Sequence, residues 1–244
     1  MNGHSLCISE QSFTYESVNM TDTNITRIEA GGVNCYLIKV KDGFVLIDTG
    51  YAKHRDNIDA ALAKAGCDTL NLIILTHGDF DHVGNCAYLR KKFGCKVAMH
   101  VDDVGMVEKG DMFWNREMGR AMRAIGKIYT LVKRIGLDDE DMFSPDTFLK
   151  DRQELTEFGF DATVHHLSGH SKGSIGLLTT DCDLFCGDIF TNVSMPKGSE
   201  LLSNRNDYVK SLDRIQSFDA QTVYPGHGLP FDRNALSIIF QEFN

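Results

Sequence analysis

Four side chains that can bind a metal ion lie within six consecutive positions of this sequence: His77, Asp79, Asp81 and His82. They directly follow the apolar run 72–75, which is typical of a fully buried strand. A strand end followed by a tight polar turn holds several side chains at one point. Imidazole and carboxylate groups at this spacing indicate a divalent cation such as zinc, iron or manganese. The alternative is a solvated acidic turn with two incidental histidines.

Three more candidate ligands, His170, Asp188 and His227, each follow a glycine near the end of a later apolar run. Glycine allows the tight loops that deliver a side chain to a site, although each histidine alone could equally cap a turn. Asp48 comes directly after the apolar run 44–47 and could meet the same site.

Alternating apolar runs and turn residues predict the elements that must position these side chains. Predicted strands cover 25–28, 33–40, 44–47, 70–75, 96–99, 162–167, 174–179, 184–186 and 222–224. Predicted helices cover about 58–65, 82–93, 206–217 and 232–243, and residues 1–24 are predicted to be a loosely held arm or an edge strand. No repeat or Pro/Ser-rich linker interrupts the chain, so a single domain over 1–244 is expected.

Residues 101–150 break the alternation and are expected to form a helical insert. Apolar residues recur at helical spacing along a predicted helix at 114–135, and five cations lie on nearly the opposite face. These cations are Arg116, Arg120, Arg123, Lys127 and Arg134. One interpretation is a buried apolar stripe under a solvated basic face. The other is a flap whose Trp114, Met118 and Met122 side chains roof a substrate pocket.

The composition narrows the class of protein. A formal net charge of −9 argues against a nucleic-acid or anionic-membrane partner, and no apolar run is long enough to span a bilayer. No secretory signal is visible, and the seven cysteines are scattered, which indicates reduced thiols in the cytoplasm. The expected partner is a small-molecule substrate; the oligomeric state is left open.

The order of the candidate ligands resembles the metallo-β-lactamase superfamily. That family has a strand ending in Asp, followed by His-x-His-x-Asp-His, Gly-His, Gly-Asp and Pro-Gly-His-Gly. Here the same order reads Asp48-Thr49-Gly50, His77-x-Asp79-x-Asp81-His82, Gly169-His170, Gly187-Asp188 and Pro225-Gly226-His227-Gly228. The resemblance implies an α/β fold (α+β in some schemes), a four-layer αββα sandwich of two mixed β-sheets flanked by helices.

The resemblance also implies a ligand set for two divalent metal ions. Site one would contain His77, Asp79 and His170; site two would contain Asp81, His82 and His227; Asp188 would bridge the two. Asp48 would hold the ligand loops in place rather than bind metal.

The departure from the family pattern is Asp79, where most members have histidine. A third carboxylate, together with a bound hydroxide, would cancel the charge of two divalent ions, and it favours iron or manganese over zinc. Flavodiiron proteins also have a carboxylate at this position.

The function implied is a metal-dependent hydrolase that uses a metal-bound hydroxide on an ester, thioester or lactone, with Asp81 and Asp188 as catalytic residues. The alternatives are a diiron redox enzyme related to flavodiiron proteins, a phosphodiesterase, and a metal-containing sensing or binding protein without turnover. Fold alone does not decide among these activities.

Overall fold

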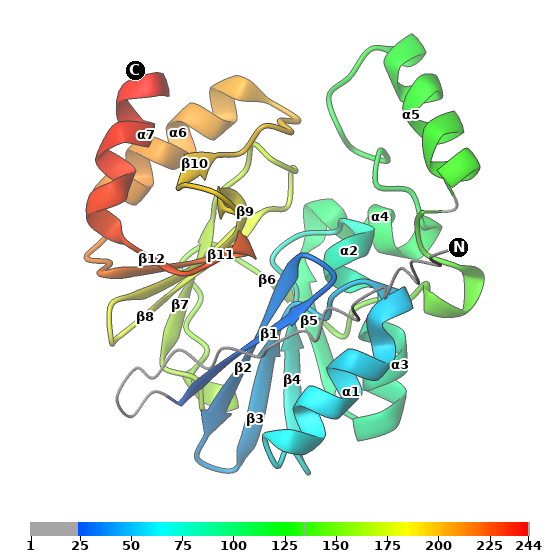
Figure 1. The fold of residues 1–244 in the computed structure, drawn as a ribbon, viewed down its shortest axis with the longest axis vertical. Helices are drawn as coiled ribbons and strands as arrows, with labels where there is room; N and C mark the ends of the chain where they lie inside the picture. Colours follow the sequence, from blue (N-terminus) through cyan, green and yellow to red (C-terminus); the bar gives the residue numbers. More distant parts are fainter. Residues whose placement is uncertain (1–23, 134, 244) are drawn as a thin grey trace, which may run out of the picture.

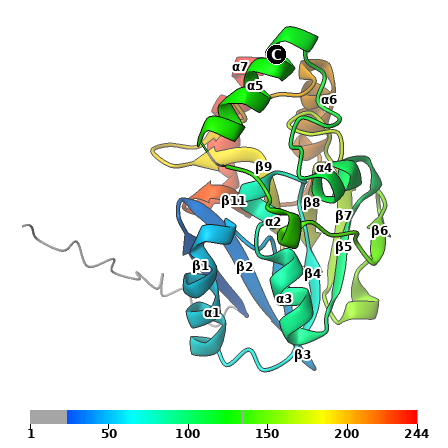
Figure 2. The ribbon, with the colours of Figure 1, turned by 90° about the vertical axis from the view of Figure 1, so that its right-hand side faces the viewer.

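The computed structural model describes residues 24–133 and 135–243. The segment predicted as an arm or edge strand lies almost wholly outside these residues. In the described part, two six-stranded β-sheets pack face to face, with helices on both outer faces (Figures 1 and 2). This arrangement is the αββα sandwich expected from the sequence.

The first sheet is built from the N-terminal half of the chain, in the order β1-β2-β3-β4-β5-β6. Its strands are β1 (Ile25–Ala30), β2 (Val33–Val40), β3 (Gly43–Ile47), β4 (Leu70–Ile74), β5 (Lys96–His100) and β6 (Thr147–Leu149). The β1–β2–β3 pairs are antiparallel, whereas β3, β4, β5 and β6 are parallel. The carboxyl ends of these parallel strands therefore meet at one edge, where sites in α/β proteins usually form.

The second sheet has the order β12-β11-β9-β8-β7, and β10 pairs with β9 at the side. Its strands are β7 (Ala162–His166), β8 (Ile175–Thr179), β9 (Asp183–Asn192), β10 (Lys197–Gly198), β11 (Thr222–Gly228) and β12 (Phe231–Asp232). Only β9 and β11 run parallel. The pairing between β9 and β11 is irregular around Pro225, which bends this part of the sheet beside the ligand loop of His227.

Helices cover the outer face of each sheet. The first sheet is covered by α1 (Arg55–Lys64), α2 (Phe80–Val83), α3 (Cys86–Phe93) and α4 (Val104–Lys109), and the second by α6 (Arg205–Gln216) and α7 (Leu236–Phe243). Ile58 and Leu89 from the first group are fully buried, as are Leu212 and Ile239 from the second. A third apolar cluster, including Val45, fills the space between the sheets. The core is thus divided into three layers that fix the relative position of the two sheets.

The insert differs from the sequence prediction. Its long helix, α5 (Arg120–Lys133), begins six residues later than expected, and none of its residues is buried. It stands away from the sandwich in Figure 1. The apolar stripe is exposed, with Met122 at 59% and Val132 at 72% of their accessible surface, so the interpretation of a buried stripe is wrong. No described helix is long and apolar enough to cross a membrane.

Candidate metal centre

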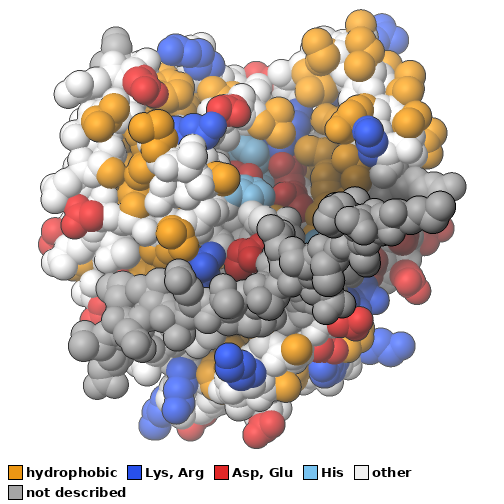
Figure 3. All heavy atoms as spheres, viewed as in Figure 1, with side chains coloured by type: hydrophobic (Ala, Val, Ile, Leu, Met, Phe, Trp, Pro, Cys, Tyr) orange, Lys and Arg blue, Asp and Glu red, His pale blue; other side chains and the backbone are white. Residues whose placement is uncertain are grey.

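The predicted ligands meet at one edge of the sandwich. His77, Asp79, Asp81 and His82 follow β4; His170 follows β7; Asp188 lies in β9 and His227 in β11. Histidine and acidic side chains lie at the bottom of a hollow in the molecular surface (Figure 3). This cavity of about 530 Å³ is lined by Asp79, Phe80, Asp81, Met112, His170, Asp188, Thr191, Val193, Ser194, Lys197, Ser199, Glu200, Leu201 and His227. The sequence therefore brings candidate ligands from both sheets to one accessible place.

The first group of candidate ligands contains His77, Asp79 and His170, all buried. Asp79 Oδ2 lies 3.7 Å from His77 Nε2 and 3.2 Å from His170 Nε2. One carboxylate oxygen thus faces two imidazole nitrogens, which is a donor set suited to zinc or iron.

The second group contains Asp81, His82 and His227. The Nε2 atoms of the two histidines are 3.4 Å apart, and Asp81 Oδ2 lies 3.6 Å from His227 Nε2 and 3.9 Å from His82 Nε2. Asp81 is more accessible than Asp79: 24% of its side chain is exposed, compared with 6% for Asp79. Its carboxylate lines the cavity.

Asp188 lies between the two groups. Its Oδ1 is 3.3 Å from His82 Nε2, and its Oδ2 is 3.3 Å from His227 Nε2 and 4.0 Å from His170 Nε2. Gly226 makes this packing possible, because a Cβ at that position would lie 2.3 Å from Asp188 Oδ1. The two oxygens of Asp188 therefore face histidines of both groups.

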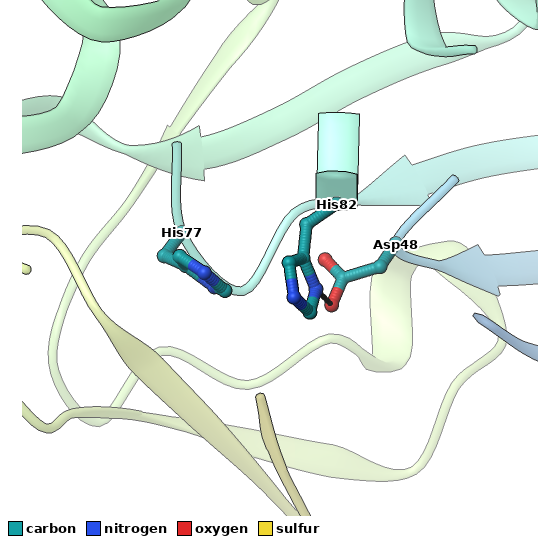
Figure 4. A group of neighbouring side chains, drawn as sticks. All are labelled: Asp48, His77 and His82. Atoms are coloured by element: carbon teal, nitrogen blue, oxygen red, sulfur yellow. Dashed lines mark hydrogen bonds and ion pairs between the residues drawn. The ribbon is translucent and has the colours of Figure 1, made fainter. Parts of the chain in front are cut away.

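The hydrogen bonds of two histidines fix their tautomers directly. His82 Nδ1 lies 2.9 Å from the Asp48 carboxylate (Figure 4), and His227 Nδ1 lies 2.7 Å from the carbonyl oxygen of Gly32. Both acceptors lack a proton to donate, so each Nδ1 must donate. In the neutral form of each ring, Nε2 then has the free lone pair that a metal ligand requires, and this atom faces the centre.

His77 and His170 reach the same tautomer through hydroxyl groups. The Thr76 hydroxyl donates to Asp48 at 2.7 Å, so it accepts from His77 Nδ1 at 2.9 Å. Ser199 donates to a backbone carbonyl and accepts in the same way from His170 Nδ1 at 2.9 Å. All four candidate histidines therefore offer Nε2 to one place.

Two atoms at the centre are buried without a hydrogen-bond partner, His77 Nε2 and Asp188 Oδ1. A buried polar atom that lacks a partner is unfavourable unless an ion or water satisfies it. Together with the four aligned imidazoles, these atoms show that the residues present fit a bound metal ion.

The electrostatic surroundings also favour a cation. Burial lowers the pKa of His77 well below its usual value, which keeps that imidazole neutral. Burial acts in the same direction on His82, but Asp188 and Asp81 outweigh it and hold the pKa of His82 well above its usual value. For Asp188, burial raises the pKa, but His82 and His227 overcome this effect and keep its pKa well below the usual range.

Asp79 has a partner that the sequence did not indicate. Arg116, only 2% exposed, places Nη2 2.6 Å from Asp79 Oδ1 and 2.5 Å from Oδ2. Burial raises the pKa of Asp79, but the Arg116 charge holds it far below its usual range. The sequence-based placement of Arg116 on a solvated basic helix face is therefore wrong, because Arg116 precedes α5 and points into the centre.

A second residue that the sequence analysis missed is Asp103, which is completely buried. Its carboxylate accepts hydrogen bonds from the backbone of Gly78 and Gly173 and from the Ser171 hydroxyl, and so joins the loops that contain His77 and His170. Its place just after β5, at the same edge as Asp48, was the signal that could have revealed it.

The insert contributes a different side chain to the cavity from those predicted. Met112 lines it, whereas Trp114, Met118 and Met122 are not among the lining residues. The Trp114 ring packs against Lys109 and Gly105 of α4, and Met118 borders a separate depression beside α5. The structure gives no support to these three residues as the roof of the pocket.

Comparison with known proteins agrees with this geometry. Residues 28–227 match the metallo-beta-lactamase superfamily. A Beta-lactamase-like protein 2 homolog of Drosophila melanogaster is 27% identical over 88% of this chain, and the aligned part spans 65% of that protein. Hydroxyacylglutathione hydrolase GloC of Haemophilus influenzae is 30% identical over 65% of this chain and 69% of its own length. Acyl-coenzyme A thioesterase MBLAC2 of Bos taurus is 30% identical over 83% of this chain and 75% of its own length.

Solved structures show the same fold. The BLEG-1 B3 metallo-beta-lactamase has a TM-score of 0.71 at 22% identity, covering 90% of this chain and 99% of its own. TTHA1623, solved in a di-iron-bound form, has a TM-score of 0.64 at 26% identity, and the match covers 85% of this chain and 93% of TTHA1623. With the family match extending over most of the sequence and the ligand-bearing loops gathered at one edge of the sandwich, this chain belongs to the metallo-β-lactamase superfamily and is a metallo-hydrolase of that family.

Proposed function

We propose that this protein hydrolyses a thioester, or a closely related ester or lactone, at a centre that holds two divalent metal ions. The observation that carries the proposal is the convergence of four imidazole Nε2 atoms and three carboxylates at one place, where five of these seven residues line an open cavity. Bound metal ions would activate a water molecule and polarise the carbonyl oxygen of the substrate.

The assignment of residues follows the two groups and the carboxylate between them. His77, Asp79 and His170 would hold one ion, and Asp81, His82 and His227 the other, with Asp188 shared. Asp48 would keep His82, and through Thr76 also His77, in the tautomer that binds metal.

Asp81 is suited to a second role, because its carboxylate faces the cavity. There it can accept a hydrogen bond from the attacking water and orient it toward the substrate. Lys197, with its ion-pair partner Glu200, and Met112 line the same cavity and offer polar and apolar contacts to the rest of a substrate.

The preference for a thioester rests on the relatives. A hydroxyacylglutathione hydrolase and an acyl-coenzyme A thioesterase are both similar to this chain over most of their length. Similarity to the B3 metallo-beta-lactamase is at 22% identity and supports the fold alone. We therefore propose a thioester ahead of a β-lactam.

The test combines metal analysis with a substrate panel. Protein purified without added metal should contain about two ions of zinc, iron or manganese per chain, and should cleave S-acyl glutathione or acyl-coenzyme A faster than a phosphodiester. Oxygen consumption with a reduced flavin donor serves as the redox arm of the panel. Oxygen consumption without hydrolysis would replace the thioesterase proposal with a redox role. Bound metal without turnover in any assay would replace it with a sensing role.

A further inference from the structure

We infer that Asp79 and Arg116 act as one neutral unit that takes the place of a histidine at site one, with Arg116 positioning and neutralising the Asp79 carboxylate. The inference rests on the proposed two-ion centre. The pair connects the ligand turn after β4, which contains Asp79, with the insert at 101–150, which contains Arg116. Nothing in the sequence indicated that these two segments meet.

The Asp79 carboxylate lies between the two histidines of site one and Arg116. Oδ2 faces His77 Nε2 at 3.7 Å and His170 Nε2 at 3.2 Å, so it points to the shared ligand position. Arg116 Nη2 donates to both oxygens, to Oδ1 at 2.6 Å and to Oδ2 at 2.5 Å. A carboxylate fixed by a buried guanidinium keeps one orientation, and Oδ2 still has a lone pair to offer toward the two imidazoles.

Arg116 is itself held at all three of its guanidinium nitrogens. Nε donates to the carbonyl oxygen of Met112 at 3.0 Å, Nη1 donates to that of His170 at 2.9 Å, and Nη2 contacts Asp79. Its own carbonyl oxygen accepts from Arg123 of α5 at 2.8 Å. A planar guanidinium that is hydrogen-bonded at each of its nitrogens positions a carboxylate in a way that a flexible lysine does not.

The charge of the pair changes the expectation drawn from the sequence. Asp79 alone makes the centre one unit more negative than a histidine would. Arg116 cancels that charge inside the protein, where both side chains are almost inaccessible at 1% and 6%. The Asp79–Arg116 pair thus has the formal charge of a neutral imidazole, and the argument that Asp79 makes the site prefer iron or manganese over zinc on charge no longer holds.

The pair makes an unusual prediction for Asp79→His, which restores the residue common in the family. The single variant leaves Arg116 as a buried cation without a carboxylate beside a cation site. It should bind one ion per chain instead of two, and its metal-free form should melt roughly 10 °C lower. Adding Arg116→Met to Asp79→His removes that cation, and the double variant should recover both the second ion and most of the lost Tm.

The experiment is a double-mutant cycle on the full chain. Wild type, Asp79→His, Arg116→Met and the double variant are compared by zinc content after dialysis and by Tm after chelation. Arg120→Met, which removes an exposed cation of the same insert, is the matched control and should leave both measurements unchanged. A wild type that binds no metal would overturn the proposed function. A wild type with two ions whose cycle is additive would overturn the pair alone.

The double variant decides the case even when a single variant does not fold. If Asp79→His retains two ions and the wild-type Tm, Arg116 is not the partner on which Asp79 depends. If the double variant fails to fold or binds only one ion, a neutral imidazole does not replace the pair, and the inference is wrong.

Discussion

At the scale of single residues, the position of Asp188 is what the proposed two-ion centre depends on most. It contacts His82, His227 and His170, from three separate segments of the chain, at 3.3 Å, 3.3 Å and 4.0 Å. Its removal would leave His82 and His227 without their common anion. Replacing Asp188 with a small residue should therefore weaken metal binding in both groups of candidate ligands.

Asp188→Ala should lower hydrolysis by at least about a hundredfold and reduce metal content, because a lost ligand is expected to exceed the 10- to 100-fold effect of an outer partner. The measurements are kcat/KM on the best thioester and metal per chain. Asp181→Ala, on the exposed turn before β9, is the control. Near-normal metal and activity in Asp188→Ala would exclude a shared carboxylate.

Asp48 permits a separate prediction, because it is not among the residues that line the cavity but organises two histidines. Its carboxylate accepts hydrogen bonds from the Thr76 backbone at 2.8 Å, the Thr76 hydroxyl at 2.7 Å and His82 Nδ1 at 2.9 Å. Asp48→Asn places an amide donor among three donors, so metal affinity should fall about 10- to 100-fold.

Competition with a chelator of known affinity measures this change. Asp42→Asn, on the exposed β2–β3 turn, is the control. If the metal affinity of Asp48→Asn equals that of wild type, Asp48 supports the fold and not the ligands.

Candidate ligands were predictable at this scale, but their partners were not. Histidine and aspartate that cluster after a strand or follow a glycine are a local signal, and the structure brings all seven candidate ligands together. Arg116 reaches Asp79 across 37 positions, in a segment whose periodicity suggested a solvated face. Only the tertiary packing shows which cation is buried.

At the scale of elements, strands were predicted more securely than the insert. Runs such as 72–75 are apolar because both faces of β4 are covered, and burial of both faces leaves a clear pattern. In contrast, the apolar stripe of α5 is largely exposed. Periodicity predicts that a helix forms, but it does not say which partner covers its apolar face.

The insert contributes Met112 to the cavity, and this leads to a prediction about substrate binding. Met112→Ala removes apolar contact from the cavity wall, so KM should rise roughly three- to tenfold with kcat and metal content nearly unchanged. Met122→Ala, at an exposed position on α5, is the matched control and should leave KM as it was.

Steady-state kinetics on both variants decide the question. If Met122→Ala raises KM and Met112→Ala does not, α5 itself contacts the substrate, as the flap interpretation of the sequence requires.

At the scale of the whole molecule, contacts between the two sheets include a pair of histidines outside the centre. The rings of His100, at the end of β5, and His166, at the end of β7, are stacked with centroids 3.9 Å apart and planes inclined by 14°. His166 Nε2 is engaged with the carbonyl oxygen of Lys172 at 2.7 Å. Nearly parallel rings do not direct their lone pairs at one point, so this pair is a packing contact between the sheets.

This pair makes stability depend on pH. Burial and the neighbouring His166 lower the pKa of His100, so the folded protein binds fewer protons at this site than the unfolded chain does. The stabilisation is complete above the unfolded pKa of about 6.5 and is lost as the pH falls below it. His100→Phe keeps the stacking and should flatten the fall of Tm between about pH 6.5 and 5; an unchanged slope would assign the titration to other groups.

The centre itself joins the two halves of the molecule. His77 and His82 come from the first sheet, and His170, Asp188 and His227 come from the second. Ions bound among them would hold the edges of both sheets together, and only the folded state presents all the ligands at once. Metal binding should therefore appear as global stability, and not only as activity.

Chelation should lower the Tm of the wild type by roughly 8 to 16 °C when the free metal had been about a thousand times its Kd, because that excess contributes about 4 kcal/mol. Adding back zinc or iron should raise Tm in proportion to the logarithm of the free metal concentration. Asp188→Ala should show a much smaller shift, since its carboxylate connects the two groups. A Tm that stays constant over several decades of free metal would mean that the sheets are held together by packing alone and that the centre contributes nothing to folding.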